Sequence, residues 1–290
     1  MLLSYVHDFL RAMESDDSIT DTETALRHLR LLGLSDFGAV LWSIPLAGYP
    51  RVSALLPKMA SLEVQRTWTG ASGDVLLGQS LSFIRSMSCT YSRLTVSPLS
   101  GKRILDFGCG YGRLTRLCYF YSDDIWAVDP WEDALALCRE AGLQRNLFKS
   151  EELPLMLPVP EDFDVIFAYS VLTHTSERAS KALLCAMRRH LRLGGLACIT
   201  IRPIEFWKNR ESLSQGQGTQ PSRVDMERQH AQLGFAFTPH KRSPVDGEIT
   251  FGDTSMTTDW LKINAPDWRL VGFDHLPEDI LQRIVFLQRA

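Results

Sequence analysis

The residues with the clearest chemical pattern lie between positions 104 and 113. An apolar run, Ile104–Leu105, leads into Asp106, and glycines then follow at alternate positions up to Gly112. Glycine lets a backbone turn sharply and lets a ligand approach it closely, while the amides that open a following helix can donate to an anionic group. The spacing predicts a nucleotide-type binding turn. Its candidate contacts are Asp106, Gly108, Cys109, Gly110, Gly112 and Arg113.

The spacing of the glycines also bears on which cofactor is bound. A dinucleotide fingerprint calls for glycine three residues after Gly110, and Arg113 stands there instead. A sulfonium with a zwitterionic amino acid tail suits an acid at the end of a strand better than a pyrophosphate does. An NAD(P)-dependent oxidoreductase remains the alternative from another enzyme class. A glycine turn that binds no ligand and has only a structural role is a further alternative.

A second acid follows Asp106 at a distance of 23 residues. Ile125–Asp129 is an apolar run that ends in a carboxylate, and Pro130 comes next. A carboxylate at a strand end can accept both hydroxyls of a ribose. The alternative is that Asp129 caps the next helix.

Together these motifs resemble the class I, Rossmann-like, seven-stranded S-adenosylmethionine-dependent methyltransferase family, whose first motif is an acid followed by GxGxG. The resemblance implies S-adenosylmethionine as cofactor, S-adenosylhomocysteine as product and no metal. Residues 148–154 are similar to the family's adenine-binding segment, which implies contacts from Ser150 and Glu151. Lys149 departs from the pattern, because many members carry an acid there, and a solvated loop is the alternative.

Residues 163–175 resemble the family's fourth strand and the loop after it, where the resemblance implies that the reaction takes place. His174 is the candidate general base, because an imidazole near neutrality can take a proton from a hydroxyl or amine. The alternative is that His174 caps or packs the next helix. Tyr169 is expected to border the cofactor and the substrate, or to fill core volume.

Further candidates lie on either side of these motifs. Arg202 ends the predicted strand 196–202 and Trp207 follows it, at the sheet edge where open α/β folds bind ligands, and both are predicted to contact the substrate. Arg202 could hold a carboxylate or phosphate, with a surface salt bridge as the alternative. Trp68 and Gly70, in the segment 65–73, are expected to close over the cofactor. The aromatic segments 234–240 and 247–254 are expected to line an acceptor pocket, with plain packing as the alternative.

These residues require an α/β fold with a Rossmann-like, seven-stranded, mostly parallel sheet flanked by helices. Residues 1–100 have helical periodicity and are predicted to form an N-terminal cap or lid, with irregular stretches at 35–61 and 65–73. Residues 101–290 are predicted to form the cofactor-binding domain, with an insertion at 203–260 before the last two strands and a mobile loop at Ser214–Pro221. The predicted strands are 103–107, 125–129, 146–149, 163–169, 196–202, 268–273 and 283–288.

Composition narrows the choice of partner. The chain is 45% hydrophobic and 22% charged, with a net charge of −3, so no overall positive field attracts a nucleic acid. The six cysteines lack a CxxC pair, which favours a reducing, cytoplasmic location. No stretch approaches the ~20 apolar residues of a membrane span, and the N-terminus does not read as a signal peptide.

The resulting expectation is a cytoplasmic methyltransferase that acts on a small molecule. The expected reaction is O-methylation of a hydroxyl or carboxylate on a metabolite or glycan precursor, without nucleic acid or membrane partners. A non-catalytic protein that binds the cofactor to support a partner enzyme is the third alternative. The sequence leaves a homodimer open.

Overall fold

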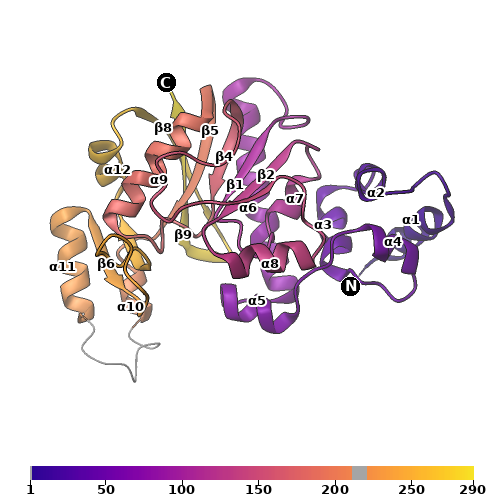
Figure 1. Cartoon of the computed structure of the whole chain (residues 1–290), viewed down its shortest axis with the longest axis horizontal. Coiled ribbons are helices and arrows are strands. Elements are labelled where there is room, and N and C mark those ends of the chain that lie inside the picture. Colours follow the sequence, from indigo (N-terminus) through magenta and orange to yellow (C-terminus); the bar gives the residue numbers. More distant parts are fainter. Residues whose placement is uncertain (1, 211–220) are drawn as a thin grey trace. The chain divides into compact units, whose positions relative to one another are not determined.

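Helices occupy most of the chain before the first strand of the computed structural model, which describes residues 2–210 and 221–290 (Figure 1). Figure 1 shows α1 to α4 grouped at the N-terminal end. These helices form because apolar residues recur at helical spacing, as Val6, Leu10 and Met13 do on the buried face of α1. The bounds are α1 Ser4–Ser15, α2 Thr22–Leu29, α3 Leu34–Ser43, α4 Pro50–Leu55, α5 Leu62–Thr69 and α6 Gly73–Thr95.

Two stretches that were expected to be irregular are helical. The expectation for 35–61 was wrong for α3 and α4, because Phe37, Val40 and Leu41 bury one face of α3 and Pro50 stands in the first turn of α4, where proline is tolerated. Residues 65–69 belong to α5, which ends at Gly70 in the left-handed conformation (φ 75°). Gly70 and Gly73 stand at helix ends, whereas Gly38 lies within α3.

The predicted sheet is confirmed: in the described residues seven strands lie in the order β3-β2-β1-β4-β5-β9-β8. β1 pairs with β2, β2 with β3 and β4 with β5 in parallel, whereas β9 runs antiparallel to both β5 and β8. Every residue of β1 and β4 is buried, as expected for parallel strands covered on both faces. The bounds are β1 Ile104–Phe107, β2 Ile125–Asp129, β3 Leu147–Lys149, β4 Phe163–Ala168, β5 Leu191–Ile201, β8 Trp268–Leu276 and β9 Asp279–Arg289. The helices between them are α7 Thr115–Cys118, α8 Glu132–Glu140, α9 Glu177–His190 and α12 Thr258–Asn264.

The chain divides into two compact units, Met1–Lys149 and Ser150–Ala290. The boundary falls inside the stretch 101–290 that the sequence assigns to one domain. The roles of residues 1–100 as a cap or lid and of 203–260 as an insertion stay predictions.

The stretch 203–260 contains regular structure that the sequence did not predict. It holds α10 (Phe206–Arg210), α11 (Arg223–Leu233) and an antiparallel pair of strands, β6 (Phe235–Pro239) and β7 (Gly252–Met256). β7 is tied to the segment after β4, because Gly252 N donates to His174 O (2.9 Å) and Thr254 N donates to Thr173 O (2.9 Å). The predicted mobile loop Ser214–Pro221 lies, apart from Pro221, outside the described residues.

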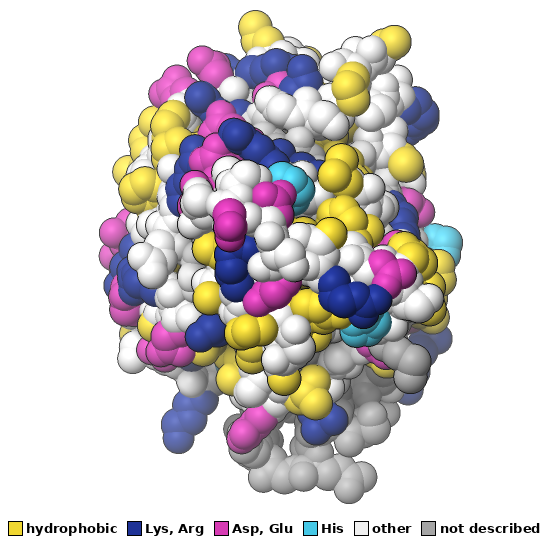
Figure 2. All heavy atoms as spheres, turned by 90° about the vertical axis from the view of Figure 1, so that its right-hand side faces the viewer, with side chains coloured by type: hydrophobic (Ala, Val, Ile, Leu, Met, Phe, Trp, Pro, Cys, Tyr) yellow, Lys and Arg dark blue, Asp and Glu magenta, His cyan; other side chains and the backbone are white. Residues whose placement is uncertain are grey.

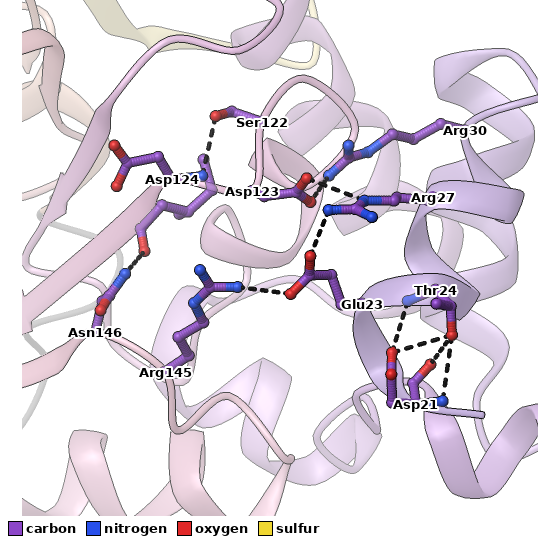
Figure 3. A network of polar contacts seen from close by, with 11 residues as sticks. Asp21, Glu23, Thr24, Arg27, Arg30, Ser122, Asp123, Asp124, Arg145 and Asn146 are labelled. Carbon is purple, nitrogen blue, oxygen red and sulfur yellow. Dashed lines mark hydrogen bonds and ion pairs between the residues drawn. The ribbon is translucent and has the colours of Figure 1, made fainter. Parts of the chain in front are cut away.

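Ion pairs fix α2 within the first unit (Figure 3). Arg27 and Arg30 both bond to Asp123, which precedes β2, and Glu23 pairs with Arg27 and with Arg145, which precedes β3. These side chains are partly exposed, so each pair adds at most about 1 kcal/mol. Their combined effect is to hold α2 against the loops that lead into two strands.

The surface mixes charges of both signs. On the face shown in Figure 2, basic and acidic side chains are interspersed. No helix of the described chain is long and apolar enough to span a bilayer. The cysteines of the described residues are all free thiols.

Candidate functional site

The first candidate site is the glycine turn after β1, within the first unit. Gly108, Gly110 and Gly112 all have positive φ (73°, 56° and 73°), which L side chains rarely adopt. A Cβ on Gly112 would stand 2.3 Å from Leu143 Cδ1, so this glycine lets the turn pack on the residues after α8. A Cβ on Gly110 would meet nothing closer than Trp68, at 3.9 Å. Gly110 is therefore the position where the backbone is open to a ligand.

Asp106, the last but one residue of β1, is buried at 2% exposure. Thr115 Oγ1 donates to its Oδ2 at 2.6 Å. Burial, with a smaller contribution from the charge of Asp129, raises the pKa of Asp106 to about 7. Thr115 and Arg113 lower this pKa and so partly offset the rise. A cation placed beside this carboxyl would relieve much of the cost of burying its charge.

Asp129, at the end of β2, is tied to the same turn. Its Oδ2 accepts from Gly110 N and its Oδ1 accepts from Trp131 N, both at 2.9 Å. Burial raises the pKa of Asp129 to about 6, although the hydrogen bonds from the two backbone amides lower it. Asp129 is not the cap of α8, whose N-cap residue is Trp131 and has no side-chain cap bond. Each oxygen of the carboxylate keeps a further lone pair for a donor such as a hydroxyl. Ribose binding stays a prediction.

Aromatic rings surround the turn. Trp68, on α5, lies edge-on to Tyr111 (ring centroids 6.3 Å apart) and against Trp131 (6.1 Å). The structure therefore brings Trp68 to Gly110, and closure of this segment over a cofactor stays a prediction. Gly70 serves as the C-cap of α5 and is exposed.

The remaining predicted cofactor contacts have varied surroundings. Arg113 is buried and its Nη1 donates to Ser80 Oγ (3.1 Å) on α6. Cys109 N donates to Val128 O (3.1 Å), and the Cys138 thiol together with burial raises the pKa of Cys109 well above its usual value. Pro130 is half-buried and Glu151 is exposed. Ser150 is buried, and its hydroxyl has no partner among the described residues.

The second candidate site, the imidazole cluster, lies in the second unit and consists of His174, Arg202, His240, Phe251 and Asp253. His174 follows β4, Arg202 follows β5 and His240 follows β6, whereas Phe251 directly precedes β7 and Asp253 lies within it. Asp253 is 8% exposed; its Oδ1 accepts from Arg202 Nη1 (2.9 Å), and its Oδ2 lies 3.0 Å from His240 Nε2. Four separate segments thus meet around one carboxylate.

His174, the predicted general base, has both ring nitrogens engaged. Arg202 Nη2 lies 2.9 Å from Nε2 and must donate to it, so Nδ1 carries the hydrogen and donates to Gly252 O at 2.8 Å. Burial lowers the pKa of His174 to about 4; Arg202 acts in the same direction and Asp253 against it. His174 is therefore a neutral acceptor near neutral pH. The next helix is capped by Ser176, so the capping alternative does not apply to His174.

Arg202 forms an ion pair in a largely buried setting, where its side chain is 12% exposed and that of Asp253 11%. Its Nη1 also donates to Thr173 O (2.9 Å), and its guanidinium lies over the Phe206 ring, 4.1 Å from the centroid. The surface salt bridge expected as the alternative is thus a partly buried one. Binding of a substrate anion by Arg202 stays a prediction.

The structure places two further predicted residues in the interior. Trp207 is 1% exposed, packs with Met226 and Ala236, and donates from Nε1 to Ser255 Oγ at 2.7 Å. This is a correction to its predicted role, because a fully buried indole fills core volume and cannot touch a substrate in this conformation. Tyr169 follows β4 and is also buried, at 8% exposure.

The sequence did not single out His240 and Asp253 as site candidates, and it included Phe251 only among the aromatic residues of 247–254. The available signal was weak: the segments 234–240 and 247–254 were noted for their aromatic residues. Their polar side chains meet only because β6 and β7 pair.

Comparison with known proteins agrees with this fold and turn. Residues 105–199 match the family model described as "Methyltransferase domain". The tRNA U34 carboxymethyltransferase of Pseudomonas fluorescens is 30% identical over 191 residues, which cover 59% of this chain and 56% of the relative. The ubiquinone biosynthesis O-methyltransferase of Azotobacter vinelandii is 32% identical over 91 residues, which cover 30% of this chain and 39% of the relative. The matches thus span about half or less of these relatives.

Solved structures share the architecture at low sequence identity. The PH0226 protein from Pyrococcus horikoshii matches with a TM-score of 0.52 at 13% identity and covers 75% of this chain and 94% of its own. An S-adenosylmethionine-dependent methyltransferase from Clostridium acetobutylicum matches with a TM-score of 0.51 at 16% identity and covers 78% and 96%. Residues 105–199 are thus a methyltransferase domain, and the strand order with the glycine turn between two acids is that of the class I, seven-stranded fold.

Proposed function

We propose that the chain is a methyltransferase that transfers the methyl group of S-adenosylmethionine to oxygen on a small molecule, a hydroxyl or carboxylate of a metabolite or glycan precursor. The single observation that carries the proposal is the first-unit turn, in which two buried carboxylates end neighbouring strands and one of them holds Gly110 N. When bound, the cofactor supplies a methyl group already activated by its sulfonium.

The residues of the turn fit such a cofactor. Asp106 and Asp129 are buried acids that gain from a cationic partner, and Gly110 leaves the backbone approachable below the Trp68 ring. The carboxylate of Asp129 would bind the ribose hydroxyls, and Trp68 would cover the site and exclude water. The Ser150 hydroxyl, buried without a partner, suits an adenine nitrogen.

The acceptor side of the proposal rests on the second unit. Its imidazole cluster follows β4 and β5, where open α/β sheets bind their ligands. Methyl transfer from a sulfonium depends on alignment and dehydration, which can contribute ~7 kcal/mol or more, so a base matters only for acceptors that must lose a proton. The net charge of −3 favours a small acceptor over tRNA, the substrate named for one group of relatives.

Titration calorimetry with S-adenosylmethionine and with S-adenosylhomocysteine tests the cofactor site. We expect Asp129→Ala to weaken both by about 100-fold, since two charge-assisted hydrogen bonds to hydroxyls are lost at about 1.5 kcal/mol each. Asp124→Ala is the matched control, because Asp124 precedes the same strand at its other end, where it pairs with Arg103. Wild-type protein that binds neither compound, or that binds NADH instead, would refute the proposal.

Formation of S-adenosylhomocysteine with candidate acceptors tests the reaction itself. Hydroxyl and carboxylate compounds form one set of assays, and bulk tRNA forms another. Turnover of tRNA alone would overturn the small-molecule assignment. Cofactor binding without turnover on any acceptor would support the accessory-protein alternative.

A further inference from the structure

His240 has a ring nitrogen that the protein leaves available. Its Nε2 lies 3.0 Å from Asp253 Oδ2, and because an ionised carboxylate only accepts hydrogen bonds, Nε2 carries the hydrogen. In the neutral ring Nδ1 then holds a lone pair. No residue of the described chain forms a hydrogen bond with Nδ1, and the side chain is 35% exposed. This is the arrangement of a base whose tautomer is set by a carboxylate.

The ring of His240 is also held in place. Its backbone N donates to Phe251 O at 3.0 Å, and its ring lies edge-on to the Phe251 ring at 5.3 Å and 77°. Asp253 is in turn held by Arg202. Since both the ring and the carboxylate are fixed, little conformational freedom is lost when a substrate hydroxyl approaches Nδ1.

His174 differs from His240 in the state of its lone pair. The Nε2 lone pair of His174 accepts from Arg202, so a proton could move there only after that bond breaks. The charged and titratable groups around His240 are Asp253 on β7, His174 at 6.4 Å between ring centroids, Arg202 beyond the carboxylate, and Arg242, whose guanidinium lies 4.5 Å from the Phe251 ring centroid. Of the two imidazoles in the cluster, His240 is the one built to take up a proton.

We infer that His240, oriented by Asp253, is the general base for a hydroxyl acceptor, and that His174 is a positioning residue that holds Arg202. The inference rests on the proposed methyl transfer. The acceptor oxygen bonds to the methyl carbon as the carbon–sulfur bond of the donor breaks, and the hydroxyl proton passes to His240 Nδ1. The products are a methyl ether, S-adenosylhomocysteine and an imidazolium whose charge Asp253 balances.

Carbethoxylation of histidines by diethyl pyrocarbonate tests the available lone pair without any acceptor. Peptide mass spectrometry on the full-length protein at pH 7 gives the rate for each histidine. We expect His240 to react about tenfold faster than His174, because one hydrogen bond must break before His174 can react. Equal rates, or faster modification of His174, would overturn the assignment of the lone pairs.

Kinetics of His240→Gln and His174→Gln test the catalytic roles, with His275→Gln on the exposed part of β8 as the control. On a hydroxyl acceptor we expect His240→Gln to lower kcat by about 100-fold and to remove the acidic limb of the pH profile. His174→Gln is expected to keep that limb and to raise KM, since it disturbs Arg202. A larger kcat loss in His174→Gln would refute the inference. Wild-type protein that binds no S-adenosylhomocysteine would instead show that the proposed function has failed, whatever the carbethoxylation rates are.

Discussion

The glycine turn of the first unit and the imidazole cluster of the second unit differ in how far along the chain their members come from. The turn uses residues 106–115 and the end of the next strand, Asp129–Trp131. The cluster joins residues near positions 174, 202, 240 and 253, and its central carboxylate is shared by Arg202 and His240.

The two sites are therefore sensitive to different substitutions. The turn is defined mainly by its backbone conformation, so the glycines and their local packing decide whether it forms. In the cluster one carboxylate binds side chains from several segments, so its loss leaves charged and polar groups unpaired in a largely buried place. Substitutions in the two sites should therefore differ in whether they cost stability or binding.

Asp253→Ala should be the most destabilising change. It removes one partner of a largely buried ion pair, which typically costs about 3–5 kcal/mol of unfolding free energy. Urea denaturation measures the loss. Asp246→Ala is the control, because Asp246 pairs with Arg178 at an exposed site and should cost less than about 1 kcal/mol. Equal losses in the two variants would show that the cluster does not hold its segments together.

Gly112→Ala and Gly110→Ala should separate stability from binding within the turn. The new Cβ at position 112 would clash with Leu143 at 2.3 Å with φ at 73°, so we expect a loss of about 3 kcal/mol in unfolding free energy. Position 110 has room, so its cost should be about 1–2 kcal/mol of backbone strain, together with weaker binding of S-adenosylhomocysteine. The reverse order of stability losses would contradict the packing role of Gly112.

Binding of S-adenosylmethionine should strengthen as the pH rises from 6 to 8. The pKa of Asp106 is raised to about 7 and that of Asp129 to about 6, so at pH 6 the first carboxyl is mostly protonated and at pH 8 both are ionised. A cation favours the ionised form, so binding releases protons, and the affinity should rise about tenfold through Asp106 alone. Calorimetry in buffers of different ionisation enthalpy counts the protons. Asp106→Asn should flatten the dependence, and an unchanged slope in that variant would assign the titration to another group.

Trp68→Ala should have the smallest effect. Loss of the aromatic cover should weaken S-adenosylhomocysteine binding about fivefold, which corresponds to about 1 kcal/mol of aromatic contact. Trp126→Ala is the control, since Trp126 stacks on Phe148 at the neighbouring strand β3. A larger effect from Trp126→Ala would show that α5 does not cover the cofactor.

Much of the sheet could be predicted because its signals are local. Ile104–Phe107 and Ile125–Asp129 are apolar runs that end at acids and turns, and both form strands close to the predicted bounds. The helices of 35–61 were missed because Gly33, Pro45 and Pro50 resemble loop signals, although they stand at helix ends or between helices. The pair β6 and β7 was missed because the alternation in Phe235–Pro239 is short and its partner strand, Gly252–Met256, is mostly polar.

The sequence alone determined the class of fold, the places of most strands along the chain and the residues of the glycine turn, because acid, glycines and helix start lie within a few positions and dictate backbone conformation directly. Only the tertiary structure decided which imidazole keeps a free nitrogen. The sequence does not distinguish His174 from His240. Their ring nitrogens differ because His174 bonds to Arg202, 28 residues away, and His240 bonds to Asp253, 13 residues away. Pairing of β7 with β6 and with the loop after β4 brings these side chains together. A hydrogen bond depends on positions in space, which spacing along the chain does not encode when several loops intervene.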